Sequence, residues 1–124
     1  MNSEIIQEGL FVGLMSGTSM DGVDVVVSEI RKSSIHIVGS TTVPYSKKLR
    51  TALEKLVFKE NPVTIHEFAV LDIEIGKRFA FAVKQALQKF GVSNSQVIAV
   101  GSHGQTIRHS PSSTPPYSLQ IGDG

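Results

Sequence analysis

The segment that decides the fold reads Phe11-Val12-Gly13-Leu14-Met15-Ser16-Gly17-Thr18-Ser19-Met20-Asp21-Gly22-Val23-Asp24-Val25-Val26-Val27. Two apolar runs flank a short stretch of glycine, hydroxyl residues and one carboxylate. Asp21-Gly22 directly before a β-branched run is a turn signal, because glycine accepts positive φ angles without steric cost. The segment therefore predicts a β-hairpin whose tip runs from Ser16 to Asp21.

The composition of this tip favours an anion-binding site. Several backbone N–H groups and the hydroxyls of Ser16, Thr18 and Ser19 can point to one place, and such a concavity attracts a negative group without any lysine. The alternative is a purely structural turn, since Asp-Gly hairpins are common and most of them bind nothing. The segment matches neither the Walker A pattern nor G-x-G-x-x-G.

Length and composition describe one ordinary globular domain. A chain of 124 residues supports a single domain with a modest core. The net charge of +1, without a run of like charges, argues against a nucleic-acid-binding surface. The lack of cysteine excludes a disulfide framework and a thiolate nucleophile, and it fits a reducing cytoplasm. The acidic start is unlike a signal peptide, and no apolar run is long enough to span a bilayer.

The chain as a whole predicts three strands, two helices and then two further strands. The first helix begins at a Ser46 cap, and Asn61-Pro62 separates it from the second. The second helix follows a capping box at Thr64-Ile65-His66-Glu67 and ends at Gly91 in the left-handed conformation. The expected strands span 10–15, 23–30, 35–43, 96–100 and 117–121, and the expected helices span 46 to 56 or 58 and about 65–90.

The sequence allows two interpretations of the surroundings of Asp72 on the second helix. It shares the apolar stripe with Ile75 and Phe79, so its carboxylate either faces a site or reaches solvent at the edge of the stripe. His36 and His66 are both expected on the surface.

A second candidate site follows the apolar strand 96–100. That strand leads into Gly101-Ser102-His103-Gly104-Gln105-Thr106-Ile107-Arg108-His109, and ligands of open α/β sheets bind beyond the carboxyl ends of such strands. The side chains of this segment can donate to and accept from sugar hydroxyls. A nucleophile elbow is excluded because the pattern is one residue short. A two-histidine metal site and a phosphate held by Arg108 and His109 remain weaker alternatives.

Both segments resemble the signatures of one family, the anhydro-N-acetylmuramic acid kinases. Residues 13–24 resemble the N-terminal signature of that family. Residues 101–109, followed by Leu119-Gln120-Ile121-Gly122-Asp123, resemble its second signature in the same order and spacing. The resemblance runs from about Phe11 to the last residue.

The resemblance implies a fold and an activity. The fold is α/β, a ribonuclease-H-like N-terminal domain of the superfamily of actin, the sugar kinases and the chaperone ATPases. Residues 1–124 would form part of that domain, a mixed sheet with an antiparallel meander plus helices, with a C-terminal domain absent from this chain. The activity is phosphorylation of an anhydro amino sugar by ATP with Mg²⁺ in cell-wall recycling. The family resemblance also implies a cytoplasmic protein, a homodimer when intact, and no nucleic-acid or membrane partner.

The resemblance also assigns site residues. The nucleotide phosphates would lie against the hairpin residues Gly17, Thr18, Ser19, Met20, Asp21, Gly22, Val23 and Asp24. The sugar would face His103, Gln105, Thr106, Gln120 and Asp123. No catalytic residue and no metal ligand is assigned.

One feature of the family is missing from the sequence. The catalytic base of the family is an aspartate in an Asp-Phe-Arg segment beyond the second signature, and this chain contains no Asp-Phe-Arg. We therefore expect the polypeptide to be a fragment without kinase activity of its own. A non-catalytic nucleotide- or sugar-binding module, half of a split enzyme and a purely structural role are the alternatives.

Overall fold

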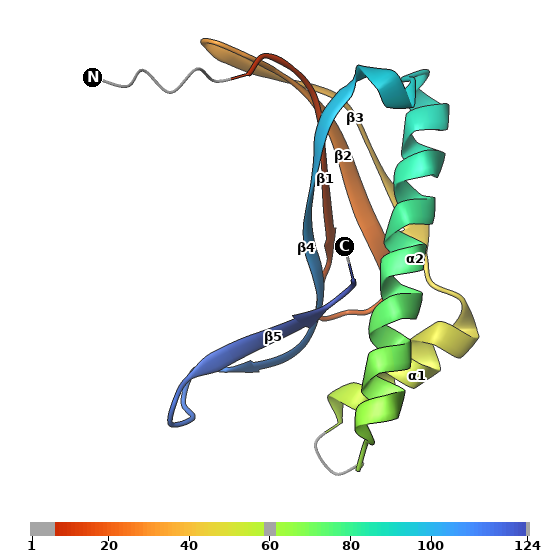
Figure 1. Ribbon diagram of the computed structural model, residues 1–124, viewed down its shortest axis with the longest axis vertical. Helices are drawn as coiled ribbons and strands as arrows, with labels where there is room; N and C mark the ends of the chain where they lie inside the picture. The colour runs from red at the N-terminus through yellow and green to blue at the C-terminus, as the bar shows by residue number, and fades with distance from the viewer. Residues whose placement is uncertain (1–6, 59–61, 124) are drawn as a thin grey trace.

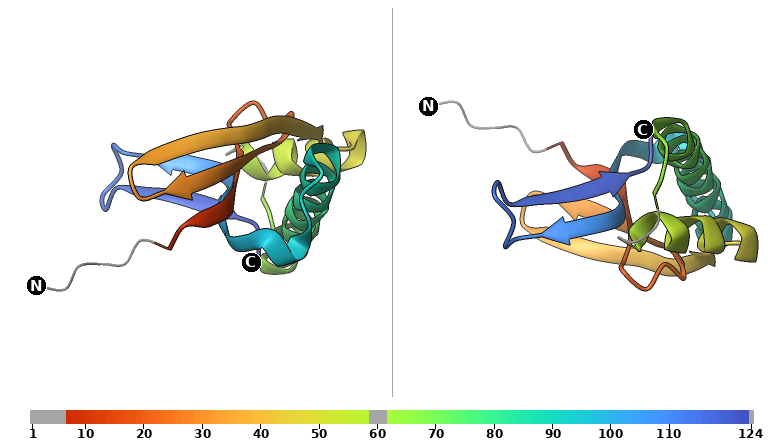
Figure 2. Two further views of the ribbon diagram at one scale, coloured as in Figure 1. Left: turned by 90° about the horizontal axis from the view of Figure 1, so that it is seen from above. Right: turned by 90° about the horizontal axis from the view of Figure 1, so that it is seen from below.

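A five-stranded sheet with both helices on one face makes up the molecule (Figures 1 and 2). The computed structural model describes residues 7–58 and 62–123. The expectations for the N-terminal segment 1–6 and for Asn61 lie outside the described residues.

β1 (Gly9–Ser16) is the central strand of the sheet. It pairs antiparallel with β2 (Gly22–Arg31), which pairs antiparallel with β3 (Ser34–Pro44). On its other side, β1 pairs in parallel with β4 (Val97–Ser110), which pairs antiparallel with β5 (Tyr117–Ile121). The order β3-β2-β1-β4-β5 confirms the predicted hairpin, the antiparallel meander and the mixed sheet.

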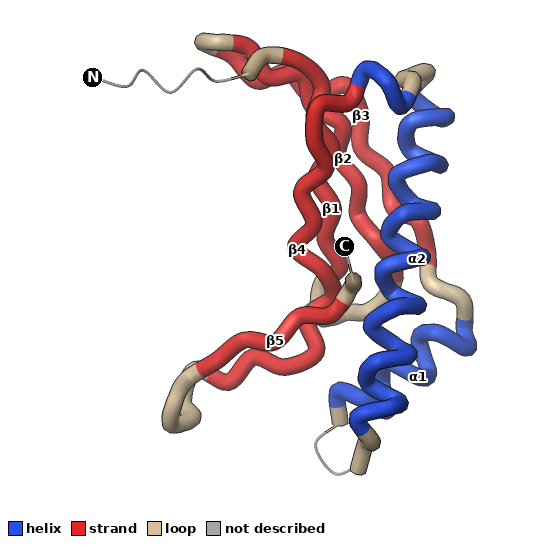
Figure 3. Tube along the Cα trace, viewed as in Figure 1, coloured by secondary structure: helices blue, strands red, loops and turns tan. Residues whose placement is uncertain are grey.

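The core lies between the sheet and the helices α1 (Lys47–Val57) and α2 (Ile65–Phe90), which follow the same side of the strands in Figure 3. Successive residues of a strand point to opposite faces, so alternate valines of β1 and β2 enter this core. The helices contribute leucine, isoleucine, phenylalanine and alanine side chains. Buried members are Val12, Leu14, Val23, Val25, Val27, Leu53, Leu56, Leu71, Ile75, Phe79, Ala82, Ala86 and Leu87.

Both predicted ends of α2 are confirmed. The Thr64 hydroxyl accepts from the Glu67 N–H (3.1 Å), and the Glu67 carboxylate accepts from the Thr64 N–H (2.8 Å). This reciprocal pair satisfies two N–H groups that a helix start leaves without partners. Gly91 ends the helix with φ of 67°, a left-handed conformation that suits glycine.

The capping box should make the stability of the domain depend on pH. Hydrogen bonds from Thr64 and then Lys55 lower the pKa of Glu67 from 4.5 to about 2. Because the unfolded chain binds this proton more tightly, the contribution of Glu67 is complete above its unfolded pKa and is lost as the pH falls toward 2. We expect Glu67→Gln, which keeps the capping geometry, to lose part of this pH dependence in thermal unfolding between about pH 5 and 2. Identical pH profiles for the two proteins would contradict the assignment.

β4 is longer and less buried than the sequence predicts. The strand continues through the whole segment 101–109, which was expected to be a loop, because the segment pairs with β1 on one side and β5 on the other. Residues 99–103 are exposed, with Val100 at 48%, and residue 96 is exposed while 97 and 98 are half-buried, so the expectation of a buried strand at 96–100 is wrong. Figure 1 shows β5 and the end of β4 turning away from the rest of the sheet.

A bulge in β4 decides which of its side chains enter the core. Leu14 pairs with Ser102, whereas Ser16 pairs with Gln105, so β4 carries one extra residue at this point. Gly104 has φ of +79°, and a Cβ atom there would lie 2.7 Å from the Ile121 carbonyl oxygen. A glycine bulge of this kind shifts the alternation of the strand by one residue. As a result Gln105 and Ile107 are both buried.

Candidate functional site

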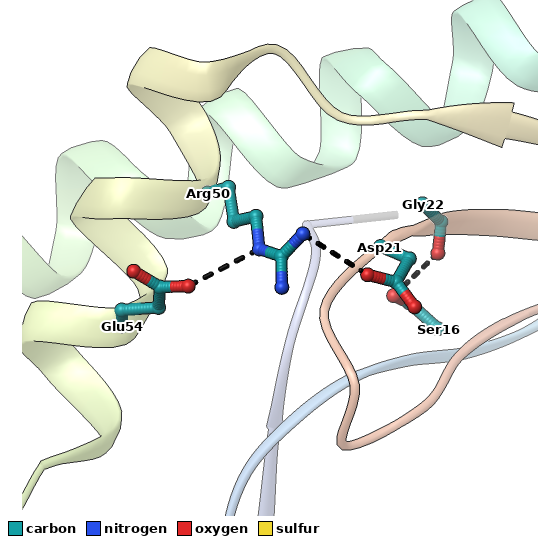
Figure 4. Close-up of polar contacts among 5 residues, drawn as sticks. All are labelled: Ser16, Asp21, Gly22, Arg50 and Glu54. Atoms are coloured by element: carbon teal, nitrogen blue, oxygen red, sulfur yellow. Dashed lines mark hydrogen bonds and ion pairs between the residues drawn. The ribbon is translucent and has the colours of Figure 1, made fainter.

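Hydrogen bonds hold the core-facing, inner side of the hairpin tip between β1 and β2. Ser16 is completely buried, and its Oγ donates to the carbonyl oxygen of Gly22 at 2.7 Å, as Figure 4 shows. The Met20 N–H donates to the Gly17 carbonyl at 3.2 Å, and Met20 has φ of 54°. These bonds join the two ends of the tip and fix its turn.

The outer side of the tip carries unused donors. Thr18 and Ser19 are exposed, and within residues 7–58 and 62–123 neither their hydroxyls nor their backbone N–H groups make a hydrogen bond. Clustered N–H and O–H donors on a fixed loop attract anions. Among the described residues, the tip therefore has internal hydrogen bonds on one side and exposed donors on the other, and the anion site stays a prediction.

Asp21 and Arg50 place a carboxylate and a guanidinium beside the tip. In Figure 4, Arg50 lies between Asp21, at 3.1 Å, and Glu54, also at 3.1 Å. The Asp21 side chain is 63% exposed, and an exposed ion pair contributes little to stability. Arg50 can thus move away from Asp21 at small cost when another cation binds there.

The other predicted nucleotide residues have different places. Val23 is completely buried in the core, and Gly22 fits closely against the backbone of Val43 and Pro44. The carboxylate of Asp24 accepts from the Thr42 hydroxyl at 2.6 Å on the adjacent strand. The Val23 side chain faces the core, so a contact between Val23 and a nucleotide would use its backbone, and the assignment of Val23 stays a prediction.

The side chain of Gln105, which the resemblance assigns to the sugar, makes its hydrogen bonds within the domain. It is completely buried, its Oε1 accepts from Ser16 (2.5 Å) and Tyr45 (3.2 Å), and its Nε2 donates to the carbonyls of Gly17 (3.0 Å) and Thr106 (2.9 Å). An amide has two donor and two acceptor positions, and all four face a partner here, with the single Ser16 proton shared between Gln105 and the Gly22 carbonyl. The Gln105 side chain is therefore bonded inside the domain in this structure, and its contact with a sugar stays a prediction.

Sequence reasoning did not identify Tyr45. Its ring is buried, and burial is the main cause that raises the pKa of its hydroxyl, so the neutral form donates to Gln105 at neutral pH. The only signal in the sequence is an aromatic residue between Pro44 and the Ser46 cap. The position of Tyr45 in the sequence does not indicate that its hydrogen-bond partner, Gln105, lies sixty residues later.

The remaining predicted sugar residues lie along β4 and β5. His103 is exposed on β4, and Thr106 and Gln120 are paired across the two strands, with Gln120 Nε2 3.4 Å from Thr106 Oγ1. Asp123 is exposed just after β5. These side chains remain accessible, unlike that of Gln105.

Asp72 has a role that neither sequence interpretation described. Its carboxylate accepts from the Gly122 N–H at 2.6 Å, and its carbonyl oxygen accepts from the Asp123 N–H at 3.3 Å. Gly76 makes this contact possible, because a Cβ atom there would lie 2.3 Å from the Asp123 carbonyl oxygen. Asp72 therefore anchors the end of the second signature to α2.

We expect Asp72→Ala to lower the free energy of unfolding by about 1.5–3 kcal/mol, since it removes a hydrogen bond to a charged acceptor. Asp72→Asn keeps an oxygen at the same place and should retain most of that energy. Urea unfolding measures both values, and the amide resonance of Gly122 reports the bond directly. Equal losses in the two variants would contradict the anchoring role.

A separate groove of about 990 Å³ lies between α1 and α2. Its walls include Leu49, Val70 and Phe81 with several lysines, and it contains none of the predicted site residues. Within residues 7–58 and 62–123, no cluster of three metal-ligating His, Asp or Glu side chains is present. In the same part of the chain, no helix is long and apolar enough to cross a membrane.

The fold and the site together define a mixed α/β domain with a glycine- and hydroxyl-rich hairpin suited to an anion. A family model described as anhydro-N-acetylmuramic acid kinase matches residues 9–124. The chain therefore belongs to the anhydro-N-acetylmuramic acid kinase family.

Curated relatives agree with this family. Proteins named anhydro-N-acetylmuramic acid kinase from Shewanella loihica and Shewanella pealeana are 43% and 45% identical to it over 113 residues, which is 91% of this chain. One from Xylella fastidiosa is 38% identical over 92% of this chain. The chain spans about 30% of the length of these relatives.

Proposed function

We propose that this chain supplies the phosphate-binding hairpin of an ATP-dependent anhydro-N-acetylmuramic acid kinase of cell-wall recycling. In this reaction water opens the anhydro ring of the sugar, and the γ-phosphoryl group of ATP passes to the freed sugar, giving the 6-phosphate and ADP. The observation that supports the proposal is the tip itself, where Thr18 and Ser19 present donors that have no partner among the described residues, on a loop whose inner side is hydrogen-bonded.

The residues present fit ATP and Mg²⁺. The N–H and O–H groups of Thr18 and Ser19 would donate hydrogen bonds to phosphate oxygens. The carboxylate of Asp21 is the oxygen ligand that Mg²⁺ prefers, and its present partner Arg50 is held only by an exposed pair. The metal, when bound, neutralises charge on the phosphate oxygens. The hairpin contributes orientation of the phosphate chain, which is the main demand of phosphoryl transfer.

For the sugar we propose His103, Thr106, Gln120 and Asp123, which remain accessible along β4, β5 and the turn after β5. Their imidazole, hydroxyl, amide and carboxylate groups supply both donors and acceptors for sugar hydroxyls. The bulge at Gly104 separates them from the buried Gln105.

We further propose that the chain is the ribonuclease-H-like N-terminal domain of the actin, sugar-kinase and chaperone-ATPase superfamily, which the antiparallel meander followed by helices supports. The 124-residue polypeptide by itself should lack kinase activity. Phosphoryl transfer needs a base that orients the attacking water, and the chain has no Asp-Phe-Arg segment. The use of Mg²⁺ and a cytoplasmic location belong to the same proposal.

A chimera tests this proposal. The matched N-terminal part of the Shewanella loihica relative, 30% of its length, would be replaced by this chain. We expect the chimera to convert the anhydro sugar and Mg-ATP to the 6-phosphate, detected by ³¹P NMR, whereas the 124-residue chain alone produces none. A folded chimera without product, or product from the chain alone, would contradict the proposal.

Matched variants of the chimera locate the phosphate site. Thr18→Ala combined with Ser19→Ala should lower kcat/KM for ATP about tenfold, the equivalent of one to two hydrogen bonds. Ser112→Ala removes an exposed hydroxyl from the loop between β4 and β5 and should leave the rate unchanged. If both variants behave alike, the hairpin is not the phosphate site.

A further inference from the structure

Two polar side chains, Ser16 and Gln105, are buried in the core of the described part of the chain, and they contact each other. Burying a polar group is unfavourable unless its hydrogen bonds are made, so such a pair needs a reason beyond packing. Each member comes from one of the two family signatures, and β1 and β4 bring them together at adjacent positions of the sheet.

The pair is bonded to both ends of the hairpin tip. The Gln105 amide donates to the Gly17 carbonyl, where the tip begins, and Ser16 Oγ donates to the Gly22 carbonyl, where it ends. The Gly17 carbonyl also accepts from Met20, which closes the turn. The Gln105 side chain is therefore linked to the bonds at Gly17 and Gly22, while a separate backbone bond from the Tyr45 N–H to the Asp21 carbonyl (3.0 Å) also holds the end of the tip.

The orientation of the amide is fixed by its surroundings. Two hydroxyls, from Ser16 and Tyr45, face its Oε1, and two backbone carbonyls face its Nε2. Turning the amide by 180° would place its oxygen against two carbonyl oxygens. Ser16 has one hydroxyl proton for two acceptors, the Gly22 carbonyl oxygen and Gln105 Oε1. When that proton is donated to Gly22, Oε1 still accepts a hydrogen bond from the Tyr45 hydroxyl.

The strand is built to place glutamine here. The Gly104 bulge turns position 105 toward the helices, where Ile107 two residues later supplies ordinary apolar packing. A residue that served only the core would be apolar, as Ile107 is. The glutamine instead extends a hydrogen-bonding group to a loop whose opposite side carries the free donors of Thr18 and Ser19.

We propose that Gln105, oriented by Tyr45 and Ser16, is a positioning residue that holds the hairpin tip in the shape that receives the nucleotide phosphates. This inference rests on the proposed function for the role of the tip. It gives Gln105 a role apart from the sugar contact that the resemblance suggests. It also links the second signature to the first, since a change at the end of β4 is transmitted to the phosphate site through one side chain.

Amide hydrogen exchange of the 124-residue chain tests the role without any nucleotide. Gln105→Met keeps the length of the side chain and removes all four bonds. We expect exchange of the Met20 N–H, which is hydrogen-bonded to the Gly17 carbonyl within the tip, to rise about tenfold. Amides of α2 should change no more than in the control Ile107→Val, which perturbs the same strand by packing alone. A rise spread evenly over tip and core would overturn the proposal, since it indicates a purely structural role.

Tyr45→Phe is a second variant that tests the same proposal if Gln105→Met does not fold. It retains the ring in the core and removes only the proton given to Gln105. Tip exchange should rise severalfold while exchange in α2 stays the same, and an unchanged tip would overturn the proposal. Because these measurements need no ATP, their failure is distinguishable from failure of the kinase assignment, which the chimera tests.

Discussion

Replacing Ile75 by alanine is expected to lower the free energy of unfolding by about 2–5 kcal/mol, the usual cost of deleting a buried isoleucine. Ile75 is completely buried in the middle of α2, and it packs against the strands and against the turn at Gly122. Its removal leaves a cavity under the anchor that Asp72 forms, so the end of the second signature should loosen with the core. Urea unfolding followed by circular dichroism measures the loss.

Ile73 is the matched control for this prediction. It is the same residue type on the same helix, two positions earlier, and it is 46% exposed. Ile73→Ala should change the free energy of unfolding by no more than about 0.5–1 kcal/mol. Similar losses for the two variants would show that α2 does not pack on the sheet through the face described above.

Gly22→Ala is the second change with a large expected effect. A Cβ atom at this position would lie 2.4 Å from the Val43 carbonyl oxygen and 2.8 Å from the Pro44 Cα atom. Both neighbours are backbone atoms and cannot rotate away, so β2 must separate from β3 at the start of their pairing. We expect a loss of about 1–3 kcal/mol or more, with altered amide resonances throughout the hairpin tip.

Gly13→Ala provides the control for the glycine. It lies in β1, and a Cβ atom there would meet nothing within 4 Å. Its effect on unfolding should stay within about 0.5 kcal/mol. If Gly22→Ala changed the free energy of unfolding as little as Gly13→Ala, the result would contradict the close approach of β2 to β3. It would also contradict the assignment of Gly22 as a fixed end of the hairpin tip.

The sequence alone predicts the features that depend on neighbouring residues. The hairpin between β1 and β2, the capping box of Thr64 and Glu67 and the left-handed Gly91 are each specified by residues within a few positions of one another, and the structure contains all three. The turn itself differs from the prediction, because the positive φ angle of the tip belongs to Met20, whereas Gly22 is the first residue of β2. The hairpin also gives the place where the predicted anion site would lie, because the donors of that site are backbone and hydroxyl groups of the turn itself.

What the sequence did not predict depends on distant partners. The burial of Gln105 requires a bulge at Gly104 and hydroxyls from Ser16 and Tyr45, which lie 89 and 60 positions away in the chain. The role of Asp72 is fixed by a backbone N–H 50 residues later. Periodicity on a helix or strand shows which face is buried, but it does not show which polar group lies on the element that packs against that face.

The most direct test of the central claim is an amide NMR titration of the 124-residue chain with Mg-ATP, with AMP as the control that lacks the β- and γ-phosphates. We expect concentration-dependent shifts at Thr18 and Ser19 with Mg-ATP and much smaller ones with AMP. We expect no shifts at His66 or Lys77 in the groove between α1 and α2. Shifts confined to that groove, or a tip that does not respond to Mg-ATP, would contradict the assignment of the hairpin as the phosphate site.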